Sequence, residues 1–314
     1  MVELVVGDRS KSCRWRGRLR RFLVPTPGGP AWGTQGDVTG EAGGAAPWKV
    51  RVVRMAQTVR QRVRLCCPDG DEVAILRVRF ARLRREEALA TLEGSFERRA
   101  ALKIYIANAH TVNLAYSDLL FRDVLNSADL MLNDGTGVQM AGRLAGKPFR
   151  DNLVGTDLVP QLCERATQRG VGVYLLGGEP GVAARAAKEL CRRAPGLRVR
   201  GARHGYFTEE EEAQIAHEIN QSGAGILLVA FGNPLQENWI HRNAPRLQCD
   251  LCIGVGGLFD HLSGRLRRAP SWMRRIGIEW VHILLNQPHK WRRYLLGNPL
   301  FLFRILAERL AGNL

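Results

Sequence analysis

Short apolar segments alternate with longer amphipathic segments between residues 73 and 264, and this alternation restricts the possible folds more than any other feature of the chain. The apolar segments have the length of buried strands, whereas the others repeat apolar residues every three or four positions, as helices do. The predicted strands are 103–107, 130–132, 172–176, 225–231 and 250–255, with 73–80 as an edge strand. The predicted helices are 85–99, 112–126, 137–146, 158–169, 182–193 and 235–243. We therefore predict an α/β fold with a Rossmann-like, mostly parallel sheet that has helices on both faces.

The two ends of the chain differ in composition from this central part. Residues 1–72 include breaker-rich stretches without hydrophobic periodicity, so we predict a disordered or poorly structured N-terminal extension. Residues 265–314 are basic and contain Trp272, Trp280 and Trp291, which predicts a helical appendage distinct from the α/β domain at 73–264.

The formal net charge of +16 indicates an anionic partner, and most of the excess charge lies near the two ends of the chain. Nucleic acid, an anionic membrane surface and a phosphorylated substrate would all satisfy this requirement. In residues 265–314 the cations alternate with aromatic side chains, as they do in helices that lie on anionic lipid surfaces. A packed C-terminal helix with solvated arginines is the alternative. We favour the membrane surface, since no nucleic-acid-binding motif accompanies the tail.

The cysteines indicate a reducing environment. Seven cysteines at irregular spacing do not form a disulfide scaffold, so a cytoplasmic location is expected. Cys249 and Cys252 form a CxxC with no second pair of metal ligands, and buried strand thiols are the favoured interpretation. The sequence contains no run of about 18 uncharged apolar residues, so we predict no membrane-spanning helix.

The predicted strand 130–132 is followed by Asn133-Asp134-Gly135-Thr136-Gly137. An acidic residue at this point lies at the carboxyl edge of the sheet, where open α/β sheets form their ligand crevice. The glycines allow a sharp turn and a close approach of the backbone to a ligand. The carboxylate could bind a ribose or take a proton from a substrate hydroxyl, and the alternative is a simple helix N-cap.

Other predicted strands end in similar polar turns. Gly177-Gly178-Glu179-Pro180-Gly181 precedes a helix and suits phosphate binding by backbone N–H groups, although it could be an ordinary βα turn. The pattern is not GxGxxG, which counts against a nucleotide-dependent oxidoreductase. Asn233, Gln236 and Glu237 follow another strand, and amides suit sugar hydroxyls and uracil edges, whereas Glu237 alone fits a first-turn acidic preference. Asn108 lies at an equivalent strand end and could orient a sugar.

Taken together, these segments resemble the WecG/TagA/CpsF family of bacterial glycosyltransferases (glycosyltransferase family 26) over about residues 73–294. The matching pieces read NAHTVN at 108–113, ADLMLNDGTG at 128–137, GTDL at 155–158, LGG at 176–178, FGNPLQE at 231–237, RAP at 268–270 and EW at 279–280. The resemblance implies an inverting transferase. It would move an N-acetylmannosamine-, N-acetylmannosaminuronate- or glucose-type sugar from UDP to a polyprenyl-diphosphate-linked saccharide for cell-surface polysaccharide or teichoic acid synthesis. It also implies peripheral binding to the inner face of the plasma membrane.

The family's proposed base corresponds to Asp134, which we predict to be the catalytic residue. Backbone N–H groups of the glycine-rich turns and arginines of the tail would stabilise the departing diphosphate, without a metal or cofactor. The predicted substrate-binding residues are Asn108, Asn133, Gly135, Thr136, Thr156, Gly177, Gly178, Asn233, Gln236, Glu237, Arg267, Arg268, Arg292 and Arg293. A homo-oligomer is possible, and no nucleic-acid partner is expected.

The chain departs from the family pattern at two positions. Ile106 replaces the threonine of a Thr-Pro-Asn motif, and Ile283 replaces the arginine of a Glu-Trp-x-Tyr-Arg motif. One candidate phosphate-binding arginine is therefore absent. These departures leave open a second interpretation, in which the protein is a non-catalytic basic scaffold or a nucleic-acid-binding protein built on the same fold.

Overall fold

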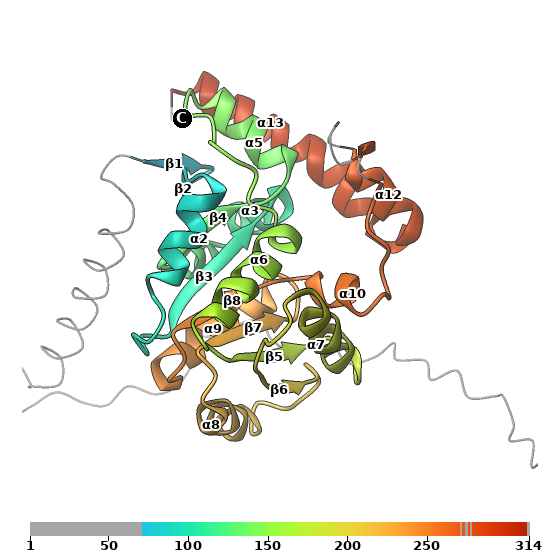
Figure 1. The fold of residues 1–314 in the computed structure, drawn as a ribbon. Coiled ribbons are helices and arrows are strands. Elements are labelled where there is room, and N and C mark those ends of the chain that lie inside the picture. Colours follow the sequence, from blue (N-terminus) through green and yellow to red (C-terminus); the bar gives the residue numbers. More distant parts are fainter. Residues whose placement is uncertain (1–70, 271, 274–275, 277, 313–314) are drawn as a thin grey trace, which may run out of the picture. The chain divides into compact units, whose positions relative to one another are not determined.

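A six-stranded parallel sheet forms the centre of the protein in the computed structural model, which describes residues 71–270, 272–273, 276 and 278–312 (Figure 1). The strand order across the sheet is β4-β3-β8-β7-β5-β6. The strands are β3 (Leu102–Ala107), β4 (Leu130–Asn133), β5 (Val173–Gly177), β6 (Val199–Arg203), β7 (Ile226–Ala230) and β8 (Leu251–Gly254). This arrangement confirms the predicted α/β class and the parallel sheet.

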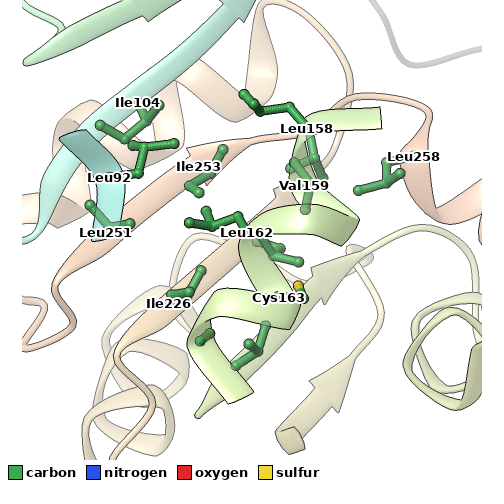
Figure 2. Close-up of a cluster of buried hydrophobic side chains, with 14 of the residues drawn as sticks. Leu92, Ile104, Leu158, Val159, Leu162, Cys163, Ile226, Leu251, Ile253 and Leu258 are labelled. Carbon is green, nitrogen blue, oxygen red and sulfur yellow. The ribbon is translucent and has the colours of Figure 1, made fainter. Parts of the chain in front are cut away.

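Helices cover both faces of the sheet, as predicted. The helices on one face are α2 (Arg85–Glu93), α6 (Gly155–Gln168), α7 (Val182–Arg193) and α10 (Leu258–Leu262). The helices on the other face are α3 (Ala109–Ser117), α4 (Leu119–Asn126), α5 (Thr136–Leu144), α8 (Glu212–Ser222), α9 (Leu235–Asn243) and α13 (Gly297–Leu310). Strands β3, β4, β5, β7 and β8 each contribute to both cores because successive side chains point to opposite faces. Ile104 packs in the first core, part of which Figure 2 shows, whereas Tyr105 packs in the second.

Two predicted elements are each divided into two in the structure, and the helix predicted at 85–99 ends at Glu93. The single strand predicted at 73–80 is wrong, because this segment is an antiparallel hairpin of β1 (Glu72–Ile75) and β2 (Val78–Ala81). Leu76 and Arg77 connect the two strands with φ of 48° and 67°, the left-handed geometry that a two-residue hairpin turn requires. The single helix predicted at 112–126 is also wrong. The backbone is extended at Asp118, whose carboxylate accepts a hydrogen bond from the Phe121 N–H (3.0 Å) and so begins α4.

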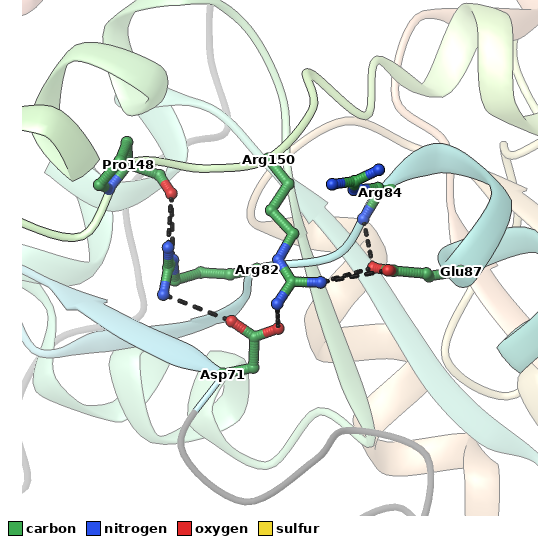
Figure 3. A network of polar contacts seen from close by, with 6 residues as sticks. All are labelled: Asp71, Arg82, Arg84, Glu87, Pro148 and Arg150. Atoms are coloured by element: carbon green, nitrogen blue, oxygen red, sulfur yellow. Dashed lines mark hydrogen bonds and ion pairs between the residues drawn. The ribbon is translucent and has the colours of Figure 1, made fainter.

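Ion pairs attach the hairpin to the rest of the protein (Figure 3). Asp71 is almost fully buried, and its carboxylate pairs with Arg82 (3.3 Å) and Arg150 (2.7 Å). Arg150 in turn pairs with Glu87 of α2 (3.1 Å). The predicted N-terminal extension, 1–72, lies outside the described residues apart from Asp71 and Glu72, which belong to this hairpin region.

The C-terminal segment is helical. It comprises α12 (Glu279–Asn286), a 3₁₀ turn at Pro288–Lys290, a π-helical turn at Arg292–Leu296, and α13. Helix α13 lies against α3 and α5 (Figure 1), and its Phe301 and Ile305 side chains are buried in the second core. The predicted C-terminal helix is therefore confirmed, and its inner face contributes to the core. In the part of the chain that the structure describes, no helix is both long enough and apolar enough to cross a membrane.

Candidate active site

The carboxyl ends of the strands and the C-terminal segment enclose a cavity of about 1320 Å³. The turns after β3, β4, β5, β7 and β8 all contribute to its lining, because the carboxyl ends of parallel strands meet at one edge of the sheet. Residues of α12 and of the segment 290–302 complete the lining. Turns that are far apart in the sequence therefore surround one volume.

Many of the residues selected from the sequence meet in this cavity. The predicted site residues that line it are Asn108, Asp134, Gly135, Thr136, Thr156, Gly178, Asn233, Gln236 and Arg293. The predicted site residues outside its lining are Asn133, Gly177, Glu237, Arg267, Arg268 and Arg292. The roles of all these residues in substrate binding or catalysis stay predictions. A ligand in the cavity can reach the residues of the first group, whereas those of the second group lie behind or beside the cavity wall.

Asp134 is the first residue after β4 and is partly exposed to the cavity. The chain turns sharply behind it, because Gly135 has a φ of 87°, a conformation that favours glycine, and forms the N-cap of α5. Burial raises the pKa of Asp134 to about 6, and the negative charge of Glu279 adds to this effect. A carboxylate with this pKa is ionised at neutral pH and is still basic enough to accept a proton.

Positive charges and one amide oppose this increase in the pKa of Asp134. They are Arg293, Arg268 and a hydrogen bond from the Asn108 side chain. The Asn108 Oδ1 atom caps α3 by accepting hydrogen bonds from the N–H groups of His110 (3.1 Å) and Thr111 (3.3 Å). The Asn108 side chain therefore links the start of α3 to Asp134. Its carbonyl oxygen caps the helix, and its NH₂ group donates to the Asp134 carboxylate.

Three basic side chains of the cavity lining are close enough to influence one another. Burial, together with the positive charges of Arg293 and Lys290, lowers the pKa of His110 to about 4. Burial and Arg293 also lower the pKa of Lys290. The Nε atom of Arg293 is buried and has no hydrogen-bond partner among the described residues. His110 is therefore neutral at pH 7, and the positive charges of Lys290 and Arg293 favour an anionic ligand, such as a diphosphate.

Three arginines of the tail lie outside the lining, and two of them have protein partners. Arg268 forms a bidentate pair with Asp157 in the first turn of α6, with distances of 2.5 and 2.7 Å. The guanidinium of Arg292 lies 5.4 Å from the ring centroid of Trp291. Arg267 is exposed, and its carbonyl oxygen lies 3.3 Å from the His282 ring nitrogen Nε2. Of the four tail arginines selected from the sequence, Arg293 is the one that faces the cavity.

Other predicted residues support the wall from behind. Asn133 is fully buried, and its Nδ2 donates to the Asp151 carbonyl oxygen (3.0 Å). A Cβ on Gly177 would collide with the backbone of Ala230, so glycine allows β5 and β7 to approach each other here. Glu237 is also fully buried, and its Oε1 accepts hydrogen bonds from Asn233 and from Gln236 (2.9 Å).

Comparison with known proteins identifies the family. A family model described as "Glycosyl transferase WecG/TagA/CpsF family" matches residues 73–313. The chain belongs to this family. A Bacillus spizizenii protein named N-acetylglucosaminyldiphosphoundecaprenol N-acetyl-beta-D-mannosaminyltransferase is 35% identical over 192 residues, which are 61% of this chain and 74% of the relative. The Bacillus subtilis protein of the same name is 30% identical over 205 residues, covering 65% and 79%. The resemblance and the glycosyltransferase role predicted from the sequence are confirmed.

Both departures from the family pattern face the cavity. Ile106 of β3 and Ile283 of α12 belong to its lining, so each contributes an apolar side chain there. Lys290 and Arg293, which follow Ile283 in the sequence, place positive charge on the same lining. The cavity therefore keeps a cationic wall although the arginine of the family motif is absent.

Sequence reasoning did not select His110, Glu279 or Lys290, which all line the cavity. Glu279 was part of a matched motif and Lys290 part of the basic tail, so a signal existed for both. Neither signal shows that a side chain points toward Asp134. Within the described residues, no group of three or more His, Cys, Asp or Glu side chains could hold a metal ion. That neither metal nor cofactor takes part stays a prediction.

Proposed function

We propose that the protein is an inverting glycosyltransferase that moves a sugar from a UDP donor to a saccharide linked to a polyprenyl diphosphate. The observation that carries this proposal is the position of Asp134, a partly exposed carboxylate with a raised pKa, at the strand edge of a large cavity that Lys290 and Arg293 also line. The printed name of the two Bacillus relatives favours an N-acetylmannosamine-type sugar and a diphosphoundecaprenol-linked N-acetylglucosamine acceptor. The product would enter cell-surface polysaccharide or teichoic acid synthesis.

In this mechanism Asp134 accepts the proton of the acceptor hydroxyl while the hydroxyl oxygen attacks the anomeric carbon of the donor sugar. The bond from that carbon to the β-phosphate oxygen breaks, and UDP leaves with the electron pair. Attack from the face opposite UDP inverts the anomeric configuration. The hydrogen bond from Asn108 orients the Asp134 carboxylate toward the cavity.

Negative charge on the departing diphosphate must be stabilised by the protein. Arg293 and Lys290 are the cations best placed for this, because both line the cavity and the Arg293 Nε lacks a partner within the described residues. The Gly178 N–H donates to the Ala230 carbonyl oxygen (3.0 Å), so further donors would come from the N–H groups that follow it in this turn, next to the N-terminal end of α7. The positive wall would therefore bind the diphosphate more strongly as its charge increases.

We further propose that the protein works while bound peripherally to the inner, cytoplasmic face of the plasma membrane. Helix α13 supports this, because Phe303, Leu306 and Leu310 repeat at helical spacing and are exposed, whereas Phe301 and Ile305 are buried. Arg309 adds a positive charge in the last turn of the helix, where its guanidinium donates to the Leu144 carbonyl oxygen (2.8 Å). An exposed apolar face on a helix that also carries basic residues is typical of helices that lie in an anionic lipid interface.

The proposal is tested by sugar transfer. Wild-type protein and Asp134→Asn would be incubated with radiolabelled UDP-ManNAc, UDP-ManNAcA, UDP-Glc or UDP-GlcNAc and a short-chain polyprenyl-diphosphate-GlcNAc or -Glc acceptor. We expect labelled lipid product from the wild type and almost none from the variant, with an inverted anomeric centre shown by NMR. Absence of transfer from every donor, in folded protein that binds anionic vesicles, would support the scaffold interpretation instead.

A further inference from the structure

A buried carboxylate lies directly behind the cavity wall at the carboxyl end of β7. Glu237, in the first turn of α9, is fully buried, and its Oε2 atom has no hydrogen-bond partner among the described residues. Its Oε1 atom accepts hydrogen bonds from the side-chain amides of Asn233 and Gln236. Both of these amide residues line the cavity, but Glu237 itself does not.

The carboxylate determines which way the two amides face. The Oε1 atom of Glu237 accepts from both amides, so each amide turns its NH₂ group toward Glu237. Gln236 then directs Oε1 away from Glu237, where it accepts the Gly256 N–H (2.9 Å) in the turn after β8. Asn233 likewise directs Oδ1 away from Glu237, and Asn233 belongs to the cavity lining.

We infer that Glu237 is a positioning residue that holds Asn233 with its carbonyl oxygen toward the ligand, so that this part of the cavity selects a hydrogen-bond donor. The inference rests on the proposed UDP-sugar donor, and two of its groups have the required chemistry. One is the N3–H of uracil. The other is a hydroxyl of the sugar.

The first group makes a specific prediction about the nucleotide. Uracil presents a hydrogen at N3, whereas cytosine presents a lone pair at the same position. An acceptor held against this position is satisfied by uracil and repelled by cytosine, and a fixed hydrogen-bonding group rejects a mismatched ligand strongly. A sugar hydroxyl would not distinguish UDP from CDP, but its hydrogen bond would be made by UDP-sugar and not by UDP.

The test is calorimetric binding of UDP, CDP and UDP-GlcNAc to the full chain and to variants. Glu237→Met removes the acceptor at similar volume, so Asn233 can turn its NH₂ toward the ligand. Glu237→Gln keeps one acceptor oxygen and is expected to hold Asn233 as before. Asn233→Ala removes the ligand contact itself. Asp250→Asn is the matched control, because Asp250 is a buried carboxylate that accepts the Arg99 N–H (2.8 Å) at the start of β8, the end away from the cavity.

If Asn233 meets uracil, the wild type prefers UDP to CDP by about tenfold or more, the scale of one hydrogen bond gained and one mismatch avoided. Glu237→Met and Asn233→Ala should each abolish this preference, and the double variant should lose no more than either single variant. Glu237→Gln and Asp250→Asn should keep it. If Asn233 meets the sugar, the same pattern appears in the ratio of UDP-GlcNAc to UDP affinity.

The inference would be overturned if Glu237→Met kept the preference of the wild type for UDP over CDP or for UDP-GlcNAc over UDP. It would also be overturned if the effects of the two single variants on this preference added up in the double variant. If Glu237→Met does not fold, as judged by circular dichroism, the other two variants decide. The inference then requires loss of preference in Asn233→Ala and retention in Glu237→Gln, and any other pattern contradicts it. Failure of the wild type to bind any uridine nucleotide would instead contradict the proposed donor, so the two failures are distinguishable.

Discussion

The carboxyl ends of β4 and β7 each carry an acidic residue whose pKa is raised by burial, yet the two regions differ in what those residues can do. Asp134 borders the cavity, and charges from three other segments surround it. Glu237 is sealed behind the wall and bonded to two amides, and burial raises its pKa to about 7. Position at a strand end therefore does not define a catalytic carboxylate. Access to the cavity and the nature of the partners do.

The two residues also differ in their place within the turn. Asp134 precedes the N-cap glycine of α5, so its side chain lies ahead of the helix, at the cavity. Glu237 is the third residue of α9, within the helix, and its side chain is enclosed with the amides of Asn233 and Gln236. Its backbone carbonyl oxygen accepts the Tyr105 hydroxyl (3.2 Å). A difference of a few residues thus separates a candidate base from a supporting group.

The largest expected difference between the two carboxylates appears when each is replaced by its isosteric amide. Asp134→Asn is expected to lower kcat by about 10²–10⁴-fold, the contribution of a positioned base, while donor binding persists. Glu237→Gln keeps its acceptor oxygen and should lower kcat by only a few fold. Both are measured by initial rates of sugar transfer and by calorimetric binding of the donor. Equal losses in the two variants would remove the distinction between base and support.

Charge in the cavity gives the next largest effect. Arg293→Met should lower kcat/KM by about 10²-fold, comparable with the loss of a donor that stabilises transition-state charge. Arg292→Met is the matched comparison, because the neighbouring residue has the same charge but contacts Trp291 outside the lining. Its effect should be much smaller. A similar loss in both variants would indicate that general tail charge, rather than the cavity cation, supports transfer.

The pH dependence should separate the two carboxylates. Because the pKa of Asp134 is about 6, kcat/KM should rise with pH through about 6 as the base loses its proton. Glu237→Gln should show the same rise of kcat/KM with pH, since we assign this rise to the ionisation of Asp134. Rates measured from pH 5 to 8 in constant ionic strength test this. If the rise of kcat/KM disappears in Glu237→Gln, the ionisation that controls the rate belongs to Glu237 and not to Asp134.

The smallest expected effect is on stability. Between pH 3.8 and about 6 the native protein binds the Asp134 proton more tightly than the unfolded chain, so the free energy of unfolding falls as pH rises through this window. The amide that replaces the carboxyl group in Asp134→Asn does not ionise, so the free energy of unfolding does not decrease in this way. The variant should therefore be more stable than the wild type at pH 7.5 by on the order of 1–3 kcal/mol. Urea denaturation measures the difference. A less stable variant would show that the charged carboxylate is favourably solvated in the fold.

Much of the fold could be predicted because local patterns determine it. Apolar runs separated by amphipathic helices leave few alternatives to a parallel sheet covered on both faces. Strand β6 was missed, since its sequence Val-Arg-Gly-Ala-Arg has no apolar run. It lies at the sheet edge, where a strand has one neighbour and its side chains stay partly exposed. The hairpin at 72–81 was missed because Leu76 and Arg77 are not typical turn residues.

The sequence by itself determined the family, the parallel sheet and the edge at which its polar turns meet. The family follows from the matched sequence motifs, whereas the sheet and its edge follow from periodicity and the order of the elements along the chain. Only the tertiary structure decided that Arg293 faces the cavity while Arg268 pairs with Asp157, and that Asp134 is accessible while Glu237 is enclosed. Side-chain partners and solvent access depend on how distant segments pack, and no local pattern in the chain encodes that packing directly.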